Sequence, residues 1–121
     1  MEIHGREINF LRTTLAACEI GDMCPNGDIS KIGALFSGKS SDVTKNMAWI
    51  MVHLNNGYEM SKHFENTDYK MHPVSFDELM CLDHDVFTAL FEEATKSFYA
   101  DRQTVEVEPS KSKKKTKETS E

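Results

Sequence analysis

Apolar positions alternate with polar ones at the start of the chain and follow a helical period through most of the rest. In the opening "MEIHGREINF", Ile3, Ile8 and Phe10 alternate with polar residues. His4 and Gly5, which stand between the two halves of this stretch, suit a tight turn, so the pattern predicts a short β-hairpin. Because two strands alone are only marginally stable in water, we expect this hairpin to pack on helices.

Two short helices are predicted on either side of the loop "GDMCPNGD". Thr13 or Thr14 can cap the first helix, "TLAACEI", which should end before the loop because its Gly, Pro and Asn residues disfavour regular structure. Asp28 can cap the second helix, "ISKIGALFSG", which should end near Gly38. The apolar residues of this second helix share one face and are Ile29, Ile32, Leu35 and Phe36.

The longest predicted helix begins at Ser41 or Asp42 and runs towards Phe64. Its apolar residues form a stripe within about a third of the circumference, as a core-facing side should. The stripe consists of Val43, Met47, Ile50, Met51, Leu54 and Tyr58.

A second row lies on another side of the same helix and consists of Trp49, His53, Met60 and Phe64. One interpretation is that the helix is buried on two sides, by other helices and by the hairpin. The other is that the row is a surface for a partner, since Trp, Met and Phe are enriched at protein interfaces. We take the four residues as the candidate partner interface.

Two further helices complete the predicted domain. In "SFDEL", Ser75 and Glu78 have the spacing of a capping box, and Asp83 can cap the last helix. That last helix carries one apolar stripe, consisting of Phe87, Leu90, Phe91, Ala94 and Phe98. The predicted fold class is therefore mainly α, with a short N-terminal β-hairpin packed on about five helices.

The helical period is lost beyond Asp101. The remaining twenty residues hold two valines and no aromatic residue, which is too little apolar surface to offset the entropy of ordering them. We expect a helical domain with its hairpin over residues 1–101 and a disordered, flexible charged tail over residues 102–121.

Charge and cysteine usage restrict the classes of function. Residues 1–101 hold eight Lys and Arg against sixteen Asp and Glu, a net charge of −8, so nucleic-acid binding by a basic face is not expected. Three cysteines with no C-x-x-C pair favour free thiols in a reducing cytosol, and Cys18 reads as a small core residue. No apolar run approaches the roughly 18 to 20 residues of a membrane span, so no membrane partner is expected.

The sequence offers little that resembles a catalytic or metal site. Asp22, Asn26 and Asp28 supply oxygens in "GDMCPNGD", but the frame and closing Glu of a calcium loop are missing, which favours a turn. His84 in "LDHD" has acidic neighbours, but adjacent residues on a helix do not face one another, and acidic residues are ordinary at a helix start. We expect a protein that is not an enzyme, with no catalytic residue, cofactor or metal; a metal-dependent enzyme remains the less favoured alternative.

Four segments together resemble the tail assembly chaperones of long-tailed, siphovirus-like bacteriophages and prophages. They are "MEIHGREINF", "CPNGDISKIGALF", "VSFDELMCLDHDVFTALFEEATKSF" and "DRQTVEVEPSKSKKK". The resemblance extends from Met1 to about Lys115. It lies in the order of the predicted elements and in the kinds of residue that form them. It implies a non-enzymatic protein with an N-terminal hairpin, a helical body and a charged, disordered C-terminus.

The resemblance also implies a set of partners. Such chaperones coat the aggregation-prone tape measure protein, associate with one another along it, and help recruit the major tail protein as the tube assembles. A frameshifted longer form is common in the family, and the codons for Lys113–Lys115 are a plausible slip site. The expected location is the cytoplasm of the bacterial host rather than the mature virion. The alternative is a small nucleic-acid-binding or regulatory helical protein, based on the lysine cluster and on the short helices around "GDMCPNGD", which could mimic a helix-turn-helix.

Overall fold

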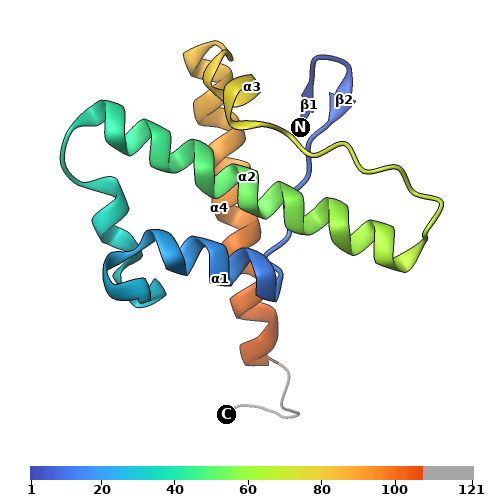
Figure 1. Ribbon diagram of the computed structural model, residues 1–121, viewed down its shortest axis with the longest axis horizontal. Helices are drawn as coiled ribbons and strands as arrows, with labels where there is room; N and C mark the ends of the chain where they lie inside the picture. The colour runs from blue at the N-terminus through green and yellow to red at the C-terminus, as the bar shows by residue number, and fades with distance from the viewer. Residues whose placement is uncertain (108–121) are drawn as a thin grey trace.

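The computed structural model describes the backbone of residues 1–107 and the side chains of residues 1–99. The protein is mainly helical with one short N-terminal hairpin, as the sequence predicts (Figure 1). No helix in the described part of the chain has the length and apolar character needed to cross a membrane. The elements are β1 (Glu2–Ile3), β2 (Arg6–Glu7), α1 (Thr14–Met23), the 3-10 helices η1 (Pro25–Gly27) and η2 (Ile29–Phe36), α2 (Ser40–Glu65), α3 (Phe76–Met80) and α4 (His84–Val107).

The hairpin forms where the alternating pattern predicts it. β1 and β2 are antiparallel, with Ile3 opposite Arg6. The turn residues His4 and Gly5 have φ values of 52° and 81°, the left-handed region that a tight primed turn requires. Ile3 and Ile8 are buried, so the hairpin is anchored on the helices through its apolar face.

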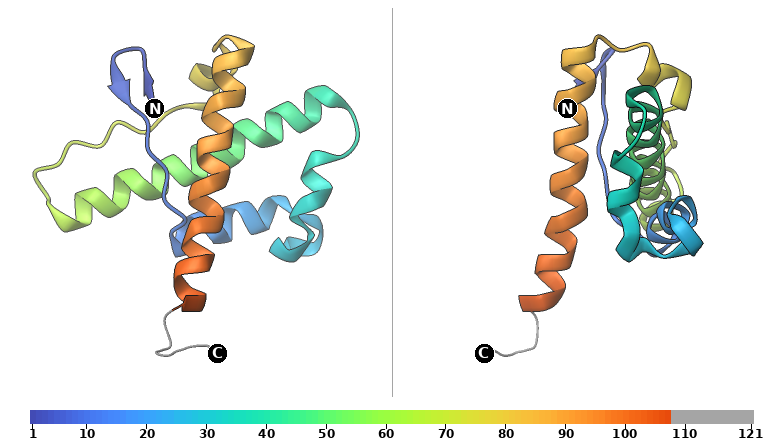
Figure 2. Two further views of the ribbon diagram at one scale, coloured as in Figure 1. Left: turned by 180° about the vertical axis from the view of Figure 1, so that it is seen from behind. Right: turned by 90° about the vertical axis from the view of Figure 1, so that its left-hand side faces the viewer.

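Helix α2 is the centre of the fold. It is 26 residues long, and α1, η2, α3 and α4 all pack against it. Figure 1 shows α4 crossing α2 at a steep angle, and the side view in Figure 2 places the N-terminal segment between these two helices. The core stripe predicted for α2 faces inward, because Ile50, Met51 and Leu54 are buried. The other members of that stripe, Val43, Met47 and Tyr58, are half-buried.

Two buried polar side chains on α2 hold irregular segments of the chain against it. Asn55 is fully buried; its Nδ2 donates to the carbonyl of Asn9 (2.9 Å) and its Oδ1 accepts from the Val74 amide (2.7 Å). One turn later, Glu59 Oε1 accepts from the Tyr69 hydroxyl and from the His72 amide, both at 2.9 Å. The connection over residues 66–75 has no regular structure of its own, so these bonds stabilise its path along the helix.

Gly57 lets the N-terminal segment run directly against α2. A Cβ at this position would lie 2.7 Å from Thr13 Oγ1 and 3.0 Å from the Leu11 carbonyl oxygen. The Leu11 amide in turn donates to the carbonyl of Leu54 (3.1 Å). Only glycine permits this backbone approach without displacing one of the two segments.

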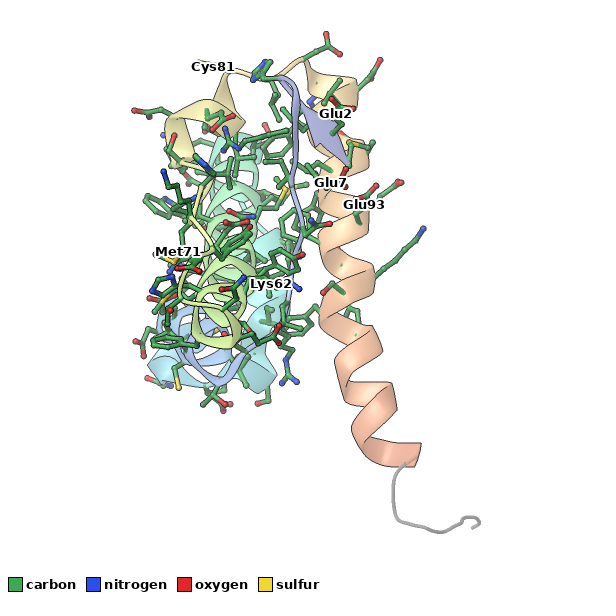
Figure 3. The ribbon with its side chains drawn as sticks, turned by 90° about the vertical axis from the view of Figure 1, so that its right-hand side faces the viewer. Glu2, Glu7, Lys62, Met71, Cys81 and Glu93 are labelled. Atoms are coloured by element: carbon green, nitrogen blue, oxygen red, sulfur yellow. The ribbon has the colours of Figure 1, made fainter. Side chains whose placement is uncertain are left out.

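Polar contacts connect the start of the chain to its last two helices. Arg6 forms a two-pronged ion pair with Glu78 of α3, at 3.0 and 3.2 Å. The Met1 ammonium bonds Glu7 and, at 3.1 Å, Glu93 of α4; Figure 3 shows these two glutamates on neighbouring elements. Burial lowers the pKa of that ammonium, but its bonds to the two carboxylates outweigh burial, so the pKa is raised overall.

Two predicted helix ends differ from the structure. Helix α1 continues through Gly21 to Met23, where we expected it to end before "GDMCPNGD". The reason is packing. Gly21 is buried, and a Cβ at this position would lie 3.7 Å from both the Gly27 carbonyl oxygen and the Ile29 Cβ. Helix α4 continues to Val107 rather than ending at Asp101, and the rest of the predicted tail, residues 108–121, lies outside the described residues.

The second predicted helix is a 3-10 helix rather than an α-helix. Asp28 caps it as expected, accepting from the Ser30 amide (3.0 Å), but Lys31 departs from helical geometry inside it. Its apolar face is only partly covered: Leu35 is buried, whereas Phe36 is 42% exposed. The capping box of α3 is confirmed on its Ser75 side, which accepts from the Glu78 amide. Asp83 similarly accepts from the Asp85 amide at the start of α4.

The cysteines correct one core assignment and give a testable prediction. Cys18 is exposed because α1 buries Ala16 and Ile20 on its opposite side, whereas Cys24 is buried. Burial, and then the charge of Asp28, raises the pKa of the Cys24 thiol, which also donates to the Ile20 carbonyl (3.3 Å). With an aromatic disulfide reagent at pH 7.5 we expect Cys18 and Cys81 to react rapidly and Cys24 only after denaturation.

The matched control for this prediction is Cys18→Ser, which should remove one rapid equivalent and leave the slow one unchanged. Three rapid equivalents in the native protein would contradict the burial of Cys24.

Candidate functional site

The four residues of the predicted partner interface lie along a side of α2 other than the one that carries its core stripe. Trp49 is 42% exposed and Phe64 is 76% exposed, whereas His53 and Met60 are half-buried. They are spaced over four turns of the helix, so the row extends along much of its length. We call this row the α2 outer face.

At its N-terminal end, the α2 outer face is joined by a residue of α3. The rings of Trp49 and Phe76 are stacked, with centroids 4.7 Å apart and planes inclined at 20°. Trp49 also contacts His53, one turn further along α2, at a centroid distance of 6.1 Å. These contacts hold the indole in place while leaving part of it exposed, so it is presented as a rigid aromatic surface.

His53 ties this aromatic cluster to α1. Its Nδ1 lies 3.0 Å from Glu19 Oε1, and both side chains are mostly covered. The pair orients the imidazole beside Trp49 and joins α1 to α2 on the outer side of the fold. Its role is therefore structural support for the exposed aromatic residues.

The C-terminal end of the α2 outer face is more open. Asn56 Nδ2 lies 3.6 Å from Met60 Sδ, and the ring of Phe64 meets the edge of the His63 ring, at a centroid distance of 5.9 Å. Among residues 1–99, Phe64 is the most exposed large apolar side chain. An aromatic ring this exposed has no role in the core and is available to a partner.

One interpretation of this row is wrong in its detail. We considered that the hairpin might cover the second side of α2, but the element beside Trp49 is α3, through Phe76. The hairpin instead joins α3 and α4, through Arg6 and Met1. Phe76 was not predicted to belong to this surface, because its segment was notable only for the capping box.

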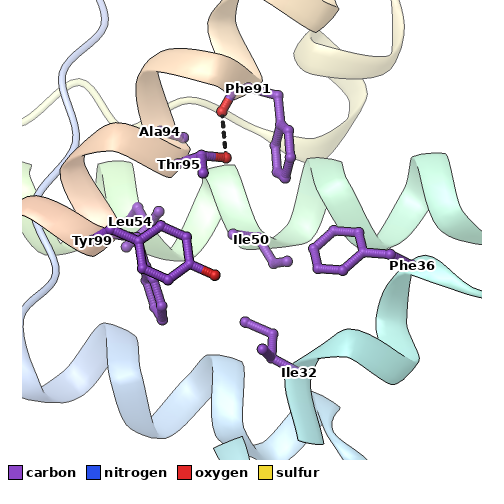
Figure 4. Close-up of a pocket in the computed structure, with 9 residues that line it drawn as sticks. Ile32, Phe36, Ile50, Leu54, Phe91, Ala94, Thr95 and Tyr99 are labelled. Atoms are coloured by element: carbon purple, nitrogen blue, oxygen red, sulfur yellow. Dashed lines mark hydrogen bonds between the residues drawn. The ribbon is translucent and has the colours of Figure 1, made fainter. Parts of the chain in front are cut away.

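A second apolar surface lies where η2, α2 and α4 meet. It is a groove of about 250 Å³, shown in Figure 4, and its lining is almost entirely apolar. Ile50 and Leu54 of α2 form the floor, with η2 on one side and α4 on the other. The lining residues on the two sides are Ile32 and Phe36 from η2, and Phe91, Ala94, Thr95, Phe98 and Tyr99 from α4.

Two acidic residues in the segments weighed as catalytic or metal sites cap helices. Asp28 caps η2, and Asp83 caps α4 beside His84. Among the described residues, no group of three or more His, Cys, Asp or Glu side chains is arranged to hold a metal ion. The α2 outer face and the groove thus provide apolar contact surfaces on a domain whose net charge is negative.

Comparison of the chain with family models, with curated proteins and with solved structures found no match. The proposal that follows therefore rests on the chain's own residues and on the resemblance described above.

Proposed function

We propose that this protein is a non-enzymatic tail assembly chaperone of a long-tailed phage or prophage, which coats and solubilises the tape measure protein. The observation that carries the proposal is the α2 outer face, where Trp49 and Phe64 are exposed on the longest helix of the fold. Large aromatic side chains exposed on one side of a helix offer a surface to which a partner can bind.

The physical match is between this surface and a long helical partner with apolar stripes. The Trp and Phe rings supply apolar contact, and the flexible side chain of Met60 adapts to different partner side chains. The body around them is acidic, with nine Lys and Arg against seventeen Asp and Glu in residues 1–107, a net charge of −8. Charge of this sign and size keeps a coated complex dissolved.

The wider role follows the resemblance. The chaperone would act in the cytoplasm of the bacterial host, associate with further copies along the tape measure protein, and give way to the major tail protein. A longer form made by frameshifting near Lys113–Lys115 would carry the recruiting domain, and neither form would remain in the mature virion.

Coexpression with the tape measure protein of the same phage tests the proposal. We expect the wild-type chain to move that protein from the pellet to the soluble fraction and to form a complex with it on a sizing column. Replacing Trp49 and Phe64 together by Ser should reduce the soluble amount several-fold, because the exposed rings of the α2 outer face are lost.

The matched control is Leu15→Ser, which removes a side chain of similar exposure (43%) from α1. It should leave solubilisation unchanged. Phe64→Ser alone separates binding from folding, since a ring that is 76% exposed contributes little to stability. No complex with wild-type protein would overturn the proposed function, and full activity of the double variant would overturn this surface as its site.

A further inference from the structure

The groove between η2, α2 and α4 is open because of how its two sides are built. On one side, η2 is a short 3-10 helix that leaves Phe36 42% exposed at the rim. On the other side, α4 packs on α2, and Figure 3 shows the C-terminal end of α4 extending beyond the rest of the fold. Tyr99, on α4, is 45% exposed. Within residues 1–99, Phe36 and Tyr99 on the two rims are thus only partly covered.

The size and lining of the groove favour side-chain anchors over a small molecule. Its volume, about 250 Å³, is below the roughly 300–1,000 Å³ usual for small-molecule sites. Polar groups that would orient a cofactor are few, since the Thr95 hydroxyl already donates to the Phe91 carbonyl (3.0 Å). One or two apolar side chains from a helix laid along the groove would fill it.

Two occupants from the chain itself fit poorly. Residues 108–121, "EPSKSKKKTKETSE", contain no aliphatic or aromatic side chain beyond one proline, so they cannot fill an apolar groove. A second copy brings apolar surface, but each chain carries a net charge of −6, so like charges oppose the pairing.

We infer that the groove between η2, α2 and α4 is a docking site for an amphipathic helix of a partner protein whose polar face is basic. The apolar face of such a helix matches the lining, and its Lys and Arg residues complement the −8 charge of residues 1–107. The inference rests on the proposed function and deepens it, because it adds a second anchoring surface and gives the charge of the segment that is bound there.

Synthetic peptides test the inference without any phage partner. One 18-residue helix with a leucine stripe and a lysine face, and a second with glutamates in place of the lysines, are titrated into the full-length protein at physiological salt. Fluorescence anisotropy should show the lysine peptide binding at least tenfold more tightly than the glutamate peptide. Equal binding of the two would overturn the basic character of the partner.

A charged side chain introduced into the groove tests its location. Thr95→Arg places a cation among the lining residues, and we expect it to weaken the lysine peptide at least tenfold. Thr88→Arg is the matched control: it makes the same change at an exposed position on α4 that does not line the groove, and should change binding less than twofold. Equal effects of the two variants would overturn the groove as the site, once circular dichroism shows both folded.

A photocrosslinker decides between the occupants. With p-benzoylphenylalanine at position 36, on the rim, mass spectrometry should find crosslinks to the lysine peptide; the same group at position 15, exposed on α1, should give few. Crosslinks to a second copy or to residues 108–121 that persist with the peptide present would overturn the inference. If the coexpression experiment fails but the peptide experiments succeed, the proposed function is overturned. The preference of the groove for a basic amphipathic helix then still holds.

Discussion

Replacing Gly57 by valine should lower the free energy of unfolding by about 3 kcal/mol. The new Cβ would lie 2.7 Å from Thr13 Oγ1 and 3.0 Å from the Leu11 carbonyl oxygen, so the N-terminal segment must move away from α2. That movement would strain the hydrogen bond from the Leu11 amide to the Leu54 carbonyl. Thermal unfolding followed by circular dichroism should show a melting temperature lower by roughly 10–20 °C.

The control for this substitution is Gly33→Val in η2. A Cβ at Gly33 meets no atom within 4 Å, so the same added side chain should change stability by about 0.5 kcal/mol or less. Equal melting temperatures for the two variants would show that the segment does not run directly against α2.

Replacing Asn55 by alanine should also cost about 3 kcal/mol, for a different reason. The substitution leaves two backbone groups without their partners: the Val74 amide, whose bond is buried, and the Asn9 carbonyl, whose bond is partly buried. Burying an unsatisfied polar group costs more than the net value of the bond that is lost. Urea unfolding should show a lower midpoint with an unchanged slope.

A neighbouring asparagine serves as the control for Asn55. Asn56 is half-buried and bonds only weakly to Met60 Sδ at 3.6 Å, so Asn56→Ala should change stability by under about 1 kcal/mol. Amide hydrogen exchange gives a local readout, since Val74 should lose protection in Asn55→Ala and keep it in Asn56→Ala. Unchanged protection at Val74 in Asn55→Ala would contradict the assigned bond.

The elements with strong local signals were predicted correctly from the sequence. The turn at His4 and Gly5, the cap at Ser75 and the inward stripe of α2 all depend on near neighbours, and the structure has each of them. The predictions that were wrong include helix ends that depend on packing between segments far apart in the chain. Gly21 continues α1 because it packs against the connection to η2, which no local pattern reveals.

The two buried polar residues of α2 escaped prediction for the same reason. Asn55 and Glu59 occupy positions that a hydrophobic pattern assigns to a solvated side, yet both are buried by segments far away in the chain. Their partners are backbone groups of irregular segments, and such pairings leave no sequence period.

The candidate surfaces were only partly predictable. Helical geometry grouped the four residues of the α2 outer face, because residues three and four apart share a side. It could not supply Phe76, which comes from α3 and stacks on Trp49. The groove was missed because its lining residues, except Thr95 and Tyr99, were assigned to the apolar stripes of the helices, and the short 3-10 form of η2 leaves Phe36 exposed.

The contacts between the two ends of the chain bear on how the protein folds as the ribosome makes it. Ser97 Oγ donates to the Phe10 carbonyl across 87 positions, and Arg6 reaches Glu78 across 72. The Arg6 contact cannot form until α3 has been made, and the Ser97 contact cannot form until α4 has been made. The first helices therefore keep part of their apolar surface exposed until then. The nascent chain is thus exposed to aggregation until its last helix leaves the ribosome.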